Sequence, residues 1–409
     1  MSRAVVNLLR VESTTARHDF KSPTAISTRH LRPAMNQKDH QPRRDWPINR
    51  RRFLAQIAAL PLALGAERLR FAQQPPITSP GSPNSRAFNF AALNQWITPN
   101  EEFFVRSHFG VPKIDVAPFV MKVTGLVERE RRFTLDELMR LPAQEEVVAL
   151  ECAGNLVGWG GVSNARWTGV RLADLLKAAG VRTEAKEVVL IGADGGTEQE
   201  AGGIEVDAYA RSIPISKAME AGTLLVFKMN GEPLPSIHGG PLRALVAGWY
   251  GMDSVKWLKQ IIVAREPSTG FYQSRRYYEA RRSGDTTTRG PLGAMRLKSQ
   301  IARPINEAQL ALAPTTIFGA AWCGDAEIAR VEVTTDGGRT WQAAELGRDR
   351  APRAWRLWSY EWKPPAAGEY VIAARAYDTR GRTQPVERDP QIITPYANNW
   401  IDRRTVEIK

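Results

Sequence analysis

The sequence predicts an α+β protein, with a mixed α and β domain at about residues 88–267 and an all-β sandwich of immunoglobulin type at residues 301–409. Three observations support this prediction. The 409 residues, 43% hydrophobic and 24% charged, suffice for two globular domains. In the first region, short β-branched runs alternate with helical patterns. In the second region, apolar and polar residues alternate between turn signals.

Residues 1–72 precede both domains and are interpreted as an export leader. The stretch INRRRFLAQIAALPLALGA places the pair Arg50-Arg51, with Arg52, before a short apolar segment and then small residues. This order predicts a twin-arginine signal, and the apolar segment is shorter than the about 20 residues of a spanning helix. The twin-arginine route carries folded proteins, so we expect a periplasmic protein with an inserted cofactor and no stable membrane span. The alternative is a buried amphipathic helix with a basic cap, and a start at Met35 would shorten the leader.

The positive charge of the chain is concentrated in this leader. The net charge is +13, and residues 1–75 contain 14 Lys and Arg against 5 Asp and Glu. Binding of nucleic acid depends on clustered charge rather than on the total. We therefore expect no nucleic-acid partner.

Local patterns within residues 88–267 predict individual elements. Strands are expected in VVALEC (147–152), EVVLIGAD (187–194) and TLLVFKMNG (223–231). Helices are expected in TLDELMRL (134–141) and RLADLLKAAG (171–180), where leucines recur at helical spacing.

The rest of the chain lacks helical patterns. Residues 268–300 are rich in Arg, Gly, Ser and Thr without periodicity, so a long connecting loop is predicted there. In IARVEVTTDGGRTWQAAEL, alternating residues flank Asp336-Gly337-Gly338, which is a hairpin signal. WRLWSYEW and GEYVIAARAYDTRG repeat the alternation, which is typical of a sandwich.

The reactive groups of the sequence exclude several enzyme classes. Beyond the leader the sequence contains two histidines, His108 and His238, and no HExxH, CxxC or CxxCH motif. Zinc sites and covalent haem are therefore not expected. A serine hydrolase elbow (GxSxG) and a dinucleotide-binding GxGxxG are also absent from the sequence.

Cys152 is the most informative reactive residue. It ends an apolar run and is followed by Ala153 and Gly154, and the other cysteine in the sequence is Cys323. Three interpretations stay open: a disulfide between the two cysteines, an inert buried thiol, or a thiolate bound to a soft metal beside a bare backbone. Cys323, in GAAWCGD, is expected in the core of the second domain.

Several stretches resemble the sulfite oxidase family of molybdenum enzymes. ECAGN (151–155) and PLPSIHGGPLRALVAGWYGMDSVKWLKQI (233–261) carry the resemblance, and the segments 103–112, 164–176 and 209–219 agree with it. FGAAWCGDAEIARVEVTTDGGRTW resembles the immunoglobulin-like dimerisation domain of that family. The resemblance covers about residues 88–409. It implies a sulfite-oxidase-type molybdopterin domain, a molybdenum-molybdopterin cofactor and a homodimer formed through residues 301–409.

The resemblance also implies roles for single residues. Cys152 is the expected molybdenum ligand, and Tyr277 the active-site tyrosine, with Tyr278 as a register alternative and an aromatic packed under the loop as another. Trp167 is expected in the pocket wall or the core. Arg106 is expected to act in catalysis and to contact the cofactor. The further expected cofactor contacts are His108, Asp194, His238, Arg243, Ser254, Val255 and Lys256.

The sequence departs from the family pattern where substrate arginines are expected. Those places read Leu156-Val157-Gly158 and, by alignment, Thr394-Pro395. Arg106 remains, and Arg166, Arg275 or Arg276 are candidates to compensate. Each charge-assisted hydrogen bond contributes about 1.5–3 kcal/mol. We therefore expect a neutral or singly charged sulfur compound to be favoured over dianionic sulfite.

The resemblance predicts a function and leaves two alternatives. The expected function is a periplasmic molybdenum oxidoreductase that oxidises sulfite or a related sulfur compound by oxygen-atom transfer coupled to two-electron transfer. Because the sequence has no haem motif, electrons are expected to pass to an external acceptor such as a cytochrome c. The alternatives are a reductase of a sulfoxide or another oxo substrate, and a non-catalytic immunoglobulin-like binding protein.

Overall fold

The structure, a computed structural model, describes residues 85–198 and 202–409, which belong to one compact unit. The predicted leader with Arg50-Arg51 lies outside the described residues. Across the described ranges no helix has the length and hydropathy needed to cross a membrane.

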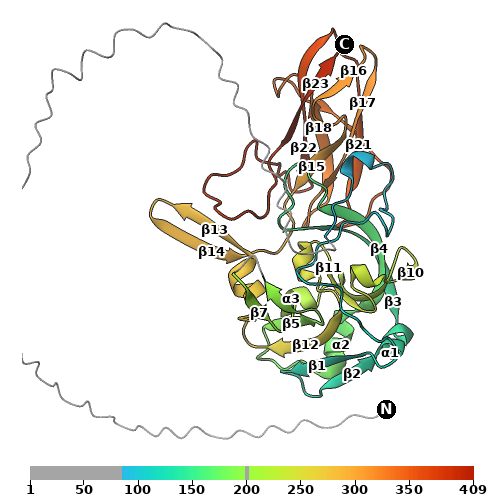
Figure 1. The fold of residues 1–409 in the computed structure, drawn as a ribbon, viewed down its shortest axis with the longest axis vertical. Coiled ribbons are helices and arrows are strands. Elements are labelled where there is room, and N and C mark those ends of the chain that lie inside the picture. The colour runs from blue at the N-terminus through green and yellow to red at the C-terminus, as the bar shows by residue number, and fades with distance from the viewer. Residues whose placement is uncertain (1–84, 199–201) are drawn as a thin grey trace, which may run out of the picture. The chain divides into compact units, whose positions relative to one another are not determined.

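The first domain is built around two sheets, one mixed and one antiparallel (Figure 1). One sheet has the order β2-β1-β12-β5-β8, with β1 and β12 parallel and the other pairs antiparallel. Its strands are β1 (Val120–Gly125), β2 (Arg131–Thr134), β5 (Glu187–Gly192), β8 (Ala210–Pro214) and β12 (Leu258–Ala264). The other sheet has the order β10-β9-β4-β3, and β11 also pairs with β9. Its strands are β3 (Ala143–Glu151), β4 (Val162–Arg171), β9 (Thr223–Met229), β10 (Glu232–Pro233) and β11 (Arg243–Val246). A short hairpin of β6 (Gly196–Glu198) and β7 (Ile204–Val206) follows β5.

Both predicted helices are present in this domain. α1 (Leu135–Arg140) begins after a capping box, in which Thr134 and Glu137 each bond to the backbone N–H of the other. α2 (Leu172–Ala179) buries its leucines against the sheet and ends at Gly180, which has φ of 72°. The remaining helical segments are η1 (Phe90–Ala92), α3 (Ile215–Ala218), η3 (Ser236–His238), η4 (Gly251–Asp253) and the π-helix η5 (Tyr272–Arg276).

The C-terminal region is a sandwich of two sheets, drawn in orange to red in Figure 1. The first has the order β15-β17-β21-β20: β15 (Lys298–Arg303), β17 (Thr315–Trp322), β20 (Glu345–Leu346) and β21 (Arg356–Trp362). The second has the order β16-β23-β22-β18-β19: β16 (Ala308–Leu310), β18 (Ile328–Thr334), β19 (Gln342–Ala343), β22 (Gly368–Asp378) and β23 (Asp402–Ile408). Gly337 and Gly338 adopt φ of 75° and 100° in the predicted turn between β18 and β19. The predicted fold class agrees with this architecture.

The segment 268–300 differs from the expected connecting loop. It contains η5 and a hairpin of β13 (Tyr278–Ser283) and β14 (Thr286–Pro291) that stands out from the sheets (Figure 1). The first strand of the sandwich sheets, β15, begins at Lys298, within this segment. The hairpin residues are largely polar and exposed, so they lack the hydrophobic alternation from which strands are predicted. The predicted domain boundaries themselves stay a prediction.

One hydrophobic core extends from the first domain into the sandwich, which also has a second core of its own. Phe90 of η1 packs against Trp322 and Trp355 of the sandwich at centroid distances of 6.3 and 6.2 Å. These three side chains belong to the same buried cluster as Leu150 and Ala153 beside Cys152. The cysteine loop is therefore supported from both domains.

Candidate functional site

All ten predicted site residues line one pocket of the first domain. They reach it from the segment 105–109, from the ends of β3 and β5, from η3 and β11, from residues 254–256 after η4, and from the end of η5. The ten are Arg106, His108, Cys152, Asp194, His238, Arg243, Ser254, Val255, Lys256 and Tyr277. Elements far apart in the sequence thus bring one cysteine and several basic side chains together.

Cys152 lies at the mouth of β3 and is half-buried. Burial raises the pKa of its thiol, while the charge of Arg106 and the backbone N–H of Gly154 oppose the rise. A Cβ on Gly154 would meet no atom within 4 Å, so the bare backbone leaves space beside the sulfur. Binding of a soft metal would replace the thiol proton.

The structure decides between the interpretations of the second cysteine. Both cysteines are free, so the alternative of a disulfide between them is wrong. Cys323 is 3% exposed and packs in the sandwich core, as expected.

Two basic side chains of the pocket, Arg243 and Lys256, donate their hydrogen bonds to uncharged groups. Arg243 is 6% exposed; its Nη1 donates to the His238 carbonyl at 2.9 Å, and its Nε has no partner among the described residues. Burial lowers the pKa of Arg243 to about 10 and that of His238 to about 4. Burial and the nearby charge of Arg243 lower the pKa of Lys256 to about 7.

One carboxyl group among the described lining residues faces these cations. Burial raises the pKa of Asp194 to about 6, although the charge of Lys256 opposes the rise. Lys256 Nζ donates a hydrogen bond to Ser107 Oγ at 2.6 Å, and this hydroxyl group carries no charge. Cations whose hydrogen-bond partners are uncharged favour an anionic ligand. The donor set therefore fits the phosphate and polar edges of a pterin cofactor, with Cys152 available to its metal.

Tyr277 is connected to a buried carboxylate through His108. Tyr277 Oη lies 2.8 Å from His108 Nε2, and His108 Nδ1 lies 2.9 Å from Glu198 Oε2. Tyr272 Oη donates to the same carboxylate oxygen at 2.7 Å. Burial raises the pKa of Glu198, but the hydrogen bonds from His108 and Tyr272 outweigh it, and the net pKa is about 2. Burial lowers the pKa of His108, which is therefore neutral at pH 7.

This geometry determines the direction of each hydrogen bond. Ionised Glu198 only accepts, so the proton of neutral His108 lies on Nδ1. His108 Nε2 is then an acceptor, and Tyr277 donates its hydroxyl proton to it. The Tyr277 oxygen remains available as an acceptor toward the pocket.

The structure also distinguishes between the roles that were open for Tyr277, Tyr278 and Trp167. Tyr277 is 6% exposed and lines the pocket, whereas Tyr278 lies on β13 with Arg289 stacked 4.7 Å from its ring centre. Trp167 is fully buried on β4 and packs edge-on against Phe103 at 5.7 Å, so it belongs to the core.

The positions of the expected substrate arginines lie outside the pocket lining. Leu156, Val157 and Thr394 are not among the described residues that line it. Arg166, a candidate to compensate, lies on β4, is 45% exposed and pairs with Glu145 at 2.5 Å. Arg276 is better placed than Arg166, because its charge acts on Tyr277 and His108. Arg275 is exposed on the same π-helix.

Sequence reasoning missed residues that support the site from behind. Arg211 Nε donates to Asp253 Oδ1 at 2.8 Å, and its Nη1 donates to the Tyr272 carbonyl at 2.5 Å, which anchors η5 before Tyr277. Arg211 and Asp253 both fall within stretches that carry the family resemblance, which is a usable signal. Glu198 lies outside those stretches and gave no local signal.

Comparisons with known proteins agree with this pocket. Residues 108–272 match the family model of the oxidoreductase molybdopterin binding domain, and residues 291–408 match that of the Mo-co oxidoreductase dimerisation domain. The chain is 36% identical over 318 residues to mitochondrial sulfite oxidase of Mus musculus, covering 71% of this chain and 57% of that protein. It is 33% identical over 322 residues to sulfite oxidase of Gallus gallus, covering 71% of this chain and 68% of that protein.

The similarity extends to a reductase and to a solved structure. The chain is 31% identical over 351 residues to inducible nitrate reductase [NADH] 1 of Glycine max, covering 76% of this chain and 39% of that protein. The crystal structure of the sulfane dehydrogenase SoxCD from Paracoccus pantotrophus superposes with a TM-score of 0.70 at 28% identity. That superposition covers 80% of this chain and 87% of the other. The chain spans 57% of the length of its mammalian relatives.

Proposed function

The chain belongs to the sulfite oxidase family of molybdopterin-dependent oxidoreductases, and from this membership we propose that it oxidises a sulfur compound by oxygen-atom transfer coupled to two-electron transfer. One observation carries the proposal: Cys152 lines a pocket together with buried Arg243 and half-buried Lys256, which both donate hydrogen bonds to uncharged partners. A cofactor-free binding module would not need this arrangement.

The chain's residues bind and orient the cofactor. When bound, molybdenum-molybdopterin supplies the oxygen-atom and electron-transfer chemistry. Cys152 would hold the metal through its thiolate. Arg243 and Lys256 would donate to the phosphate and the polar edges of the pterin. Their burial excludes water and strengthens each of these contacts. Neutral His238 donates its Nε2 proton to the Asn100 carbonyl at 2.7 Å, so its Nδ1 would offer an acceptor instead.

Tyr277 would accept a proton in the pocket and pass its own proton to His108. Oxidation of a sulfur compound with oxygen from water releases protons. The Tyr277 oxygen can accept one from water in the pocket while its own proton moves to His108 Nε2, a distance of 2.8 Å. Glu198 at His108 Nδ1 stabilises the imidazolium that this transfer creates.

We propose a substrate with less negative charge than sulfite. The similar proteins include sulfite oxidases and a sulfane dehydrogenase. Leu156, Val157 and Thr394 stand where substrate arginines are expected and lie outside the described pocket lining. Arg106 and Arg276 then provide the positive charge near Tyr277. These features support a neutral or singly charged sulfur compound.

The cellular setting is also a proposal. The Arg50-Arg51 motif supports export to the periplasm by the twin-arginine route. The match of residues 291–408 to a dimerisation domain supports a homodimer. We propose that electrons leave to an external acceptor such as a cytochrome c.

Metal analysis tests the cofactor. We expect about one molybdenum per chain, with pterin fluorescence after oxidation, in protein made in a host that synthesises molybdopterin. Cys152→Ser should lose the metal because hydroxyl oxygen is a poor ligand for a soft metal. Cys323→Ser, in the sandwich core, is the matched control. Wild type without molybdenum would contradict the proposal.

A substrate panel tests the reaction. The purified protein is mixed with sulfite, or with a thiosulfate or sulfane compound, together with a cytochrome or artificial acceptor. A parallel assay uses a reduced viologen dye with sulfoxides and nitrate, because the similarity to nitrate reductase keeps the reductase direction open. Turnover of sulfite at micromolar half-saturation would refute the low-charge substrate, and dye oxidation without sulfur oxidation would favour the reductase.

A further inference from the structure

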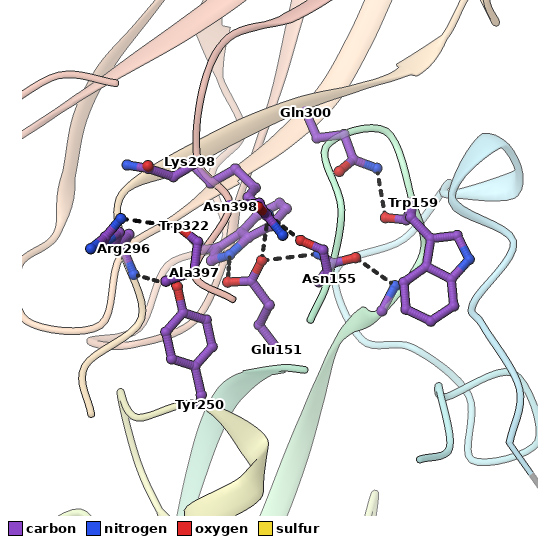
Figure 2. A network of polar contacts seen from close by, with 12 residues as sticks. Glu151, Asn155, Trp159, Tyr250, Arg296, Lys298, Gln300, Trp322, Ala397 and Asn398 are labelled. Atoms are coloured by element: carbon purple, nitrogen blue, oxygen red, sulfur yellow. Dashed lines mark hydrogen bonds and ion pairs between the residues drawn. The ribbon is translucent and has the colours of Figure 1, made fainter. Parts of the chain in front are cut away.

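The residue before Cys152 is a buried carboxylate that bonds to two side chains of the sandwich (Figure 2). Glu151 is 1% exposed; its Oε1 accepts hydrogen bonds from Lys298 Nζ at 2.6 Å and from Asn155 Nδ2 at 2.9 Å. Its Oε2 accepts a hydrogen bond from Trp322 Nε1 at 2.9 Å. Lys298 begins β15 and Trp322 ends β17, whereas Glu151 ends β3 of the first domain.

The same contacts hold the turn that carries the thiol. Lys298 Nζ also donates to the Asn155 carbonyl at 3.2 Å, and Asn155 N donates to the Cys152 carbonyl at 2.9 Å. At the other side, Cys152 N donates to the Gly161 carbonyl at 2.8 Å, and Gly161 N donates to Asn155 Oδ1 at 3.0 Å. A Cβ on Gly161 would lie 2.9 Å from that amide oxygen, so a glycine is required for this approach.

A second contact reaches the turn from the C-terminal part of the chain. Ala397 N donates to the Ala153 carbonyl at 2.8 Å, and the Ala397 carbonyl accepts from Arg296 Nη1 at 3.2 Å (Figure 2). The carbonyls of Cys152, Ala153 and Asn155 therefore all have partners. The backbone around the sulfur has little freedom while the sandwich is in place.

An ion pair at this position needs an explanation other than stability. Lys298 and Glu151 are each 1% exposed, and desolvation of a buried pair offsets much of its attraction. An apolar pair of the same volume would join the domains at least as well. Ionic hydrogen bonds provide a fixed direction, which apolar contacts do not.

We propose that Lys298, through Glu151 and Asn155, is a positioning residue for the Cys152 sulfur, so that the sandwich completes the molybdenum-binding site of the first domain. This inference rests on the proposed function only for the identity of the metal. It gives the C-terminal domain a role in the cofactor site in addition to dimerisation.

The first test uses cofactor-free protein, made in a host that cannot synthesise molybdopterin. Alkylation by iodoacetamide is followed by peptide mass spectrometry, which distinguishes Cys152 from Cys323. In Lys298→Met we expect Cys152 to react at least about tenfold faster than in wild type, because the turn opens locally. Cys323 reports on the sandwich core and should react as slowly as before.

The double variant Glu151→Gln/Lys298→Met keeps the test decisive if the single variant misfolds. It leaves no unpaired buried charge, and the amide oxygen introduced at position 151 can still accept from Trp322, so we expect it to fold. It lacks the hydrogen bond from the Lys298 side chain on β15 to the Asn155 carbonyl, so Cys152 should again react faster. The control is Arg404→Met, which breaks another buried pair, Arg404–Asp402, with atoms 3.0 Å apart in the sandwich.

The second test uses protein loaded with cofactor. We expect the double variant to lose molybdenum during purification and to show shifted g-values in the electron paramagnetic resonance signal of the half-reduced metal, which depends on the cysteine sulfur. Arg404→Met should match wild type in both. Equal rise of Cys152 and Cys323 reactivity, or a double variant that matches wild type in reactivity and metal content, overturns the inference. Absence of molybdenum from wild type contradicts the proposed function instead, and leaves the alkylation test valid.

Discussion

Glu198→Gln tests whether the buried carboxylate behind His108 directs the proton of Tyr277. The substitution keeps the shape of the side chain and removes its charge. Glutamine can donate through its amide as well as accept, so it no longer requires the His108 proton to lie on Nδ1. We expect slower turnover with little change in the Michaelis constant, because no substrate contact is assigned to Glu198.

The structure sets the magnitude of the effect on stability. The carboxylate accepts two hydrogen bonds, from His108 at 2.9 Å and from Tyr272 at 2.7 Å. Changing each hydrogen bond from charge-assisted to neutral lowers the free energy of unfolding by about 1–1.5 kcal/mol, or by about 2–3 kcal/mol for both. The fall of the Glu198 pKa from its usual 4.5 to about 2 corresponds to roughly 3 kcal/mol at pH 7, which agrees.

The sign of the pH dependence follows from the lowered pKa. Glu198 stabilises the folded state fully above pH 4.5, and this contribution is lost as the pH falls toward about 2. The stability difference between wild type and Glu198→Gln should therefore be constant near neutral pH and shrink below pH 4.5. Urea titrations at pH 7, 4 and 3 measure it.

The pH profile of turnover is the readout that a purely structural role would not change. Protonated His108 cannot accept from Tyr277, so activity should decline on the acid side below pH 6.5. Removing the negative charge of Glu198 should move this decline to lower pH. Glu205→Gln, exposed on the paired strand β7, is the control. An unshifted acid limb with normal turnover in Glu198→Gln would refute the role of this carboxylate.

Three further predictions concern charge, assembly and substrate. Burial lowers the pKa of Lys256 from 10.5 to about 7, so between pH 7 and 9.5 the unfolded chain binds this proton and the folded chain does not. Cofactor-free protein should therefore become more stable as the pH rises through this range. Urea midpoints measure the gain, and a midpoint that does not change with pH would contradict the prediction. The apolar residues Ile305 and Leu312 of the sandwich are 54% and 52% exposed, which is expected of residues that another protein surface covers. Changing both to Asp should convert a dimer to a monomer in light scattering. A dimer that persists would place the interface elsewhere. Arg276→Met should raise the Michaelis constant for anionic sulfur compounds about tenfold or more, and an uncharged reduced sulfur compound, whose Michaelis constant should not change, serves as the control.

Much of the fold could be predicted from local patterns in the sequence. The helical patterns of TLDELMRL and RLADLLKAAG act within a few residues, so α1 and α2 could be predicted. The turn residues Gly337 and Gly338 likewise predicted the hairpin of β18 and β19. The polar hairpin β13–β14 was missed because its residues face solvent and follow no hydrophobic alternation.

The sequence alone determined the chemical inventory of this protein: one cysteine at the mouth of a strand, two histidines after residue 72, and basic residues in motifs suited to a phosphate-bearing cofactor. The tertiary structure decided which groups act on them. Glu198 reaches His108 across 90 positions, and Lys298 reaches Glu151 across 147. Such contacts depend on how strands from different sheets pack together, and the directional hydrogen bonds of a buried charge form only after that packing has excluded water.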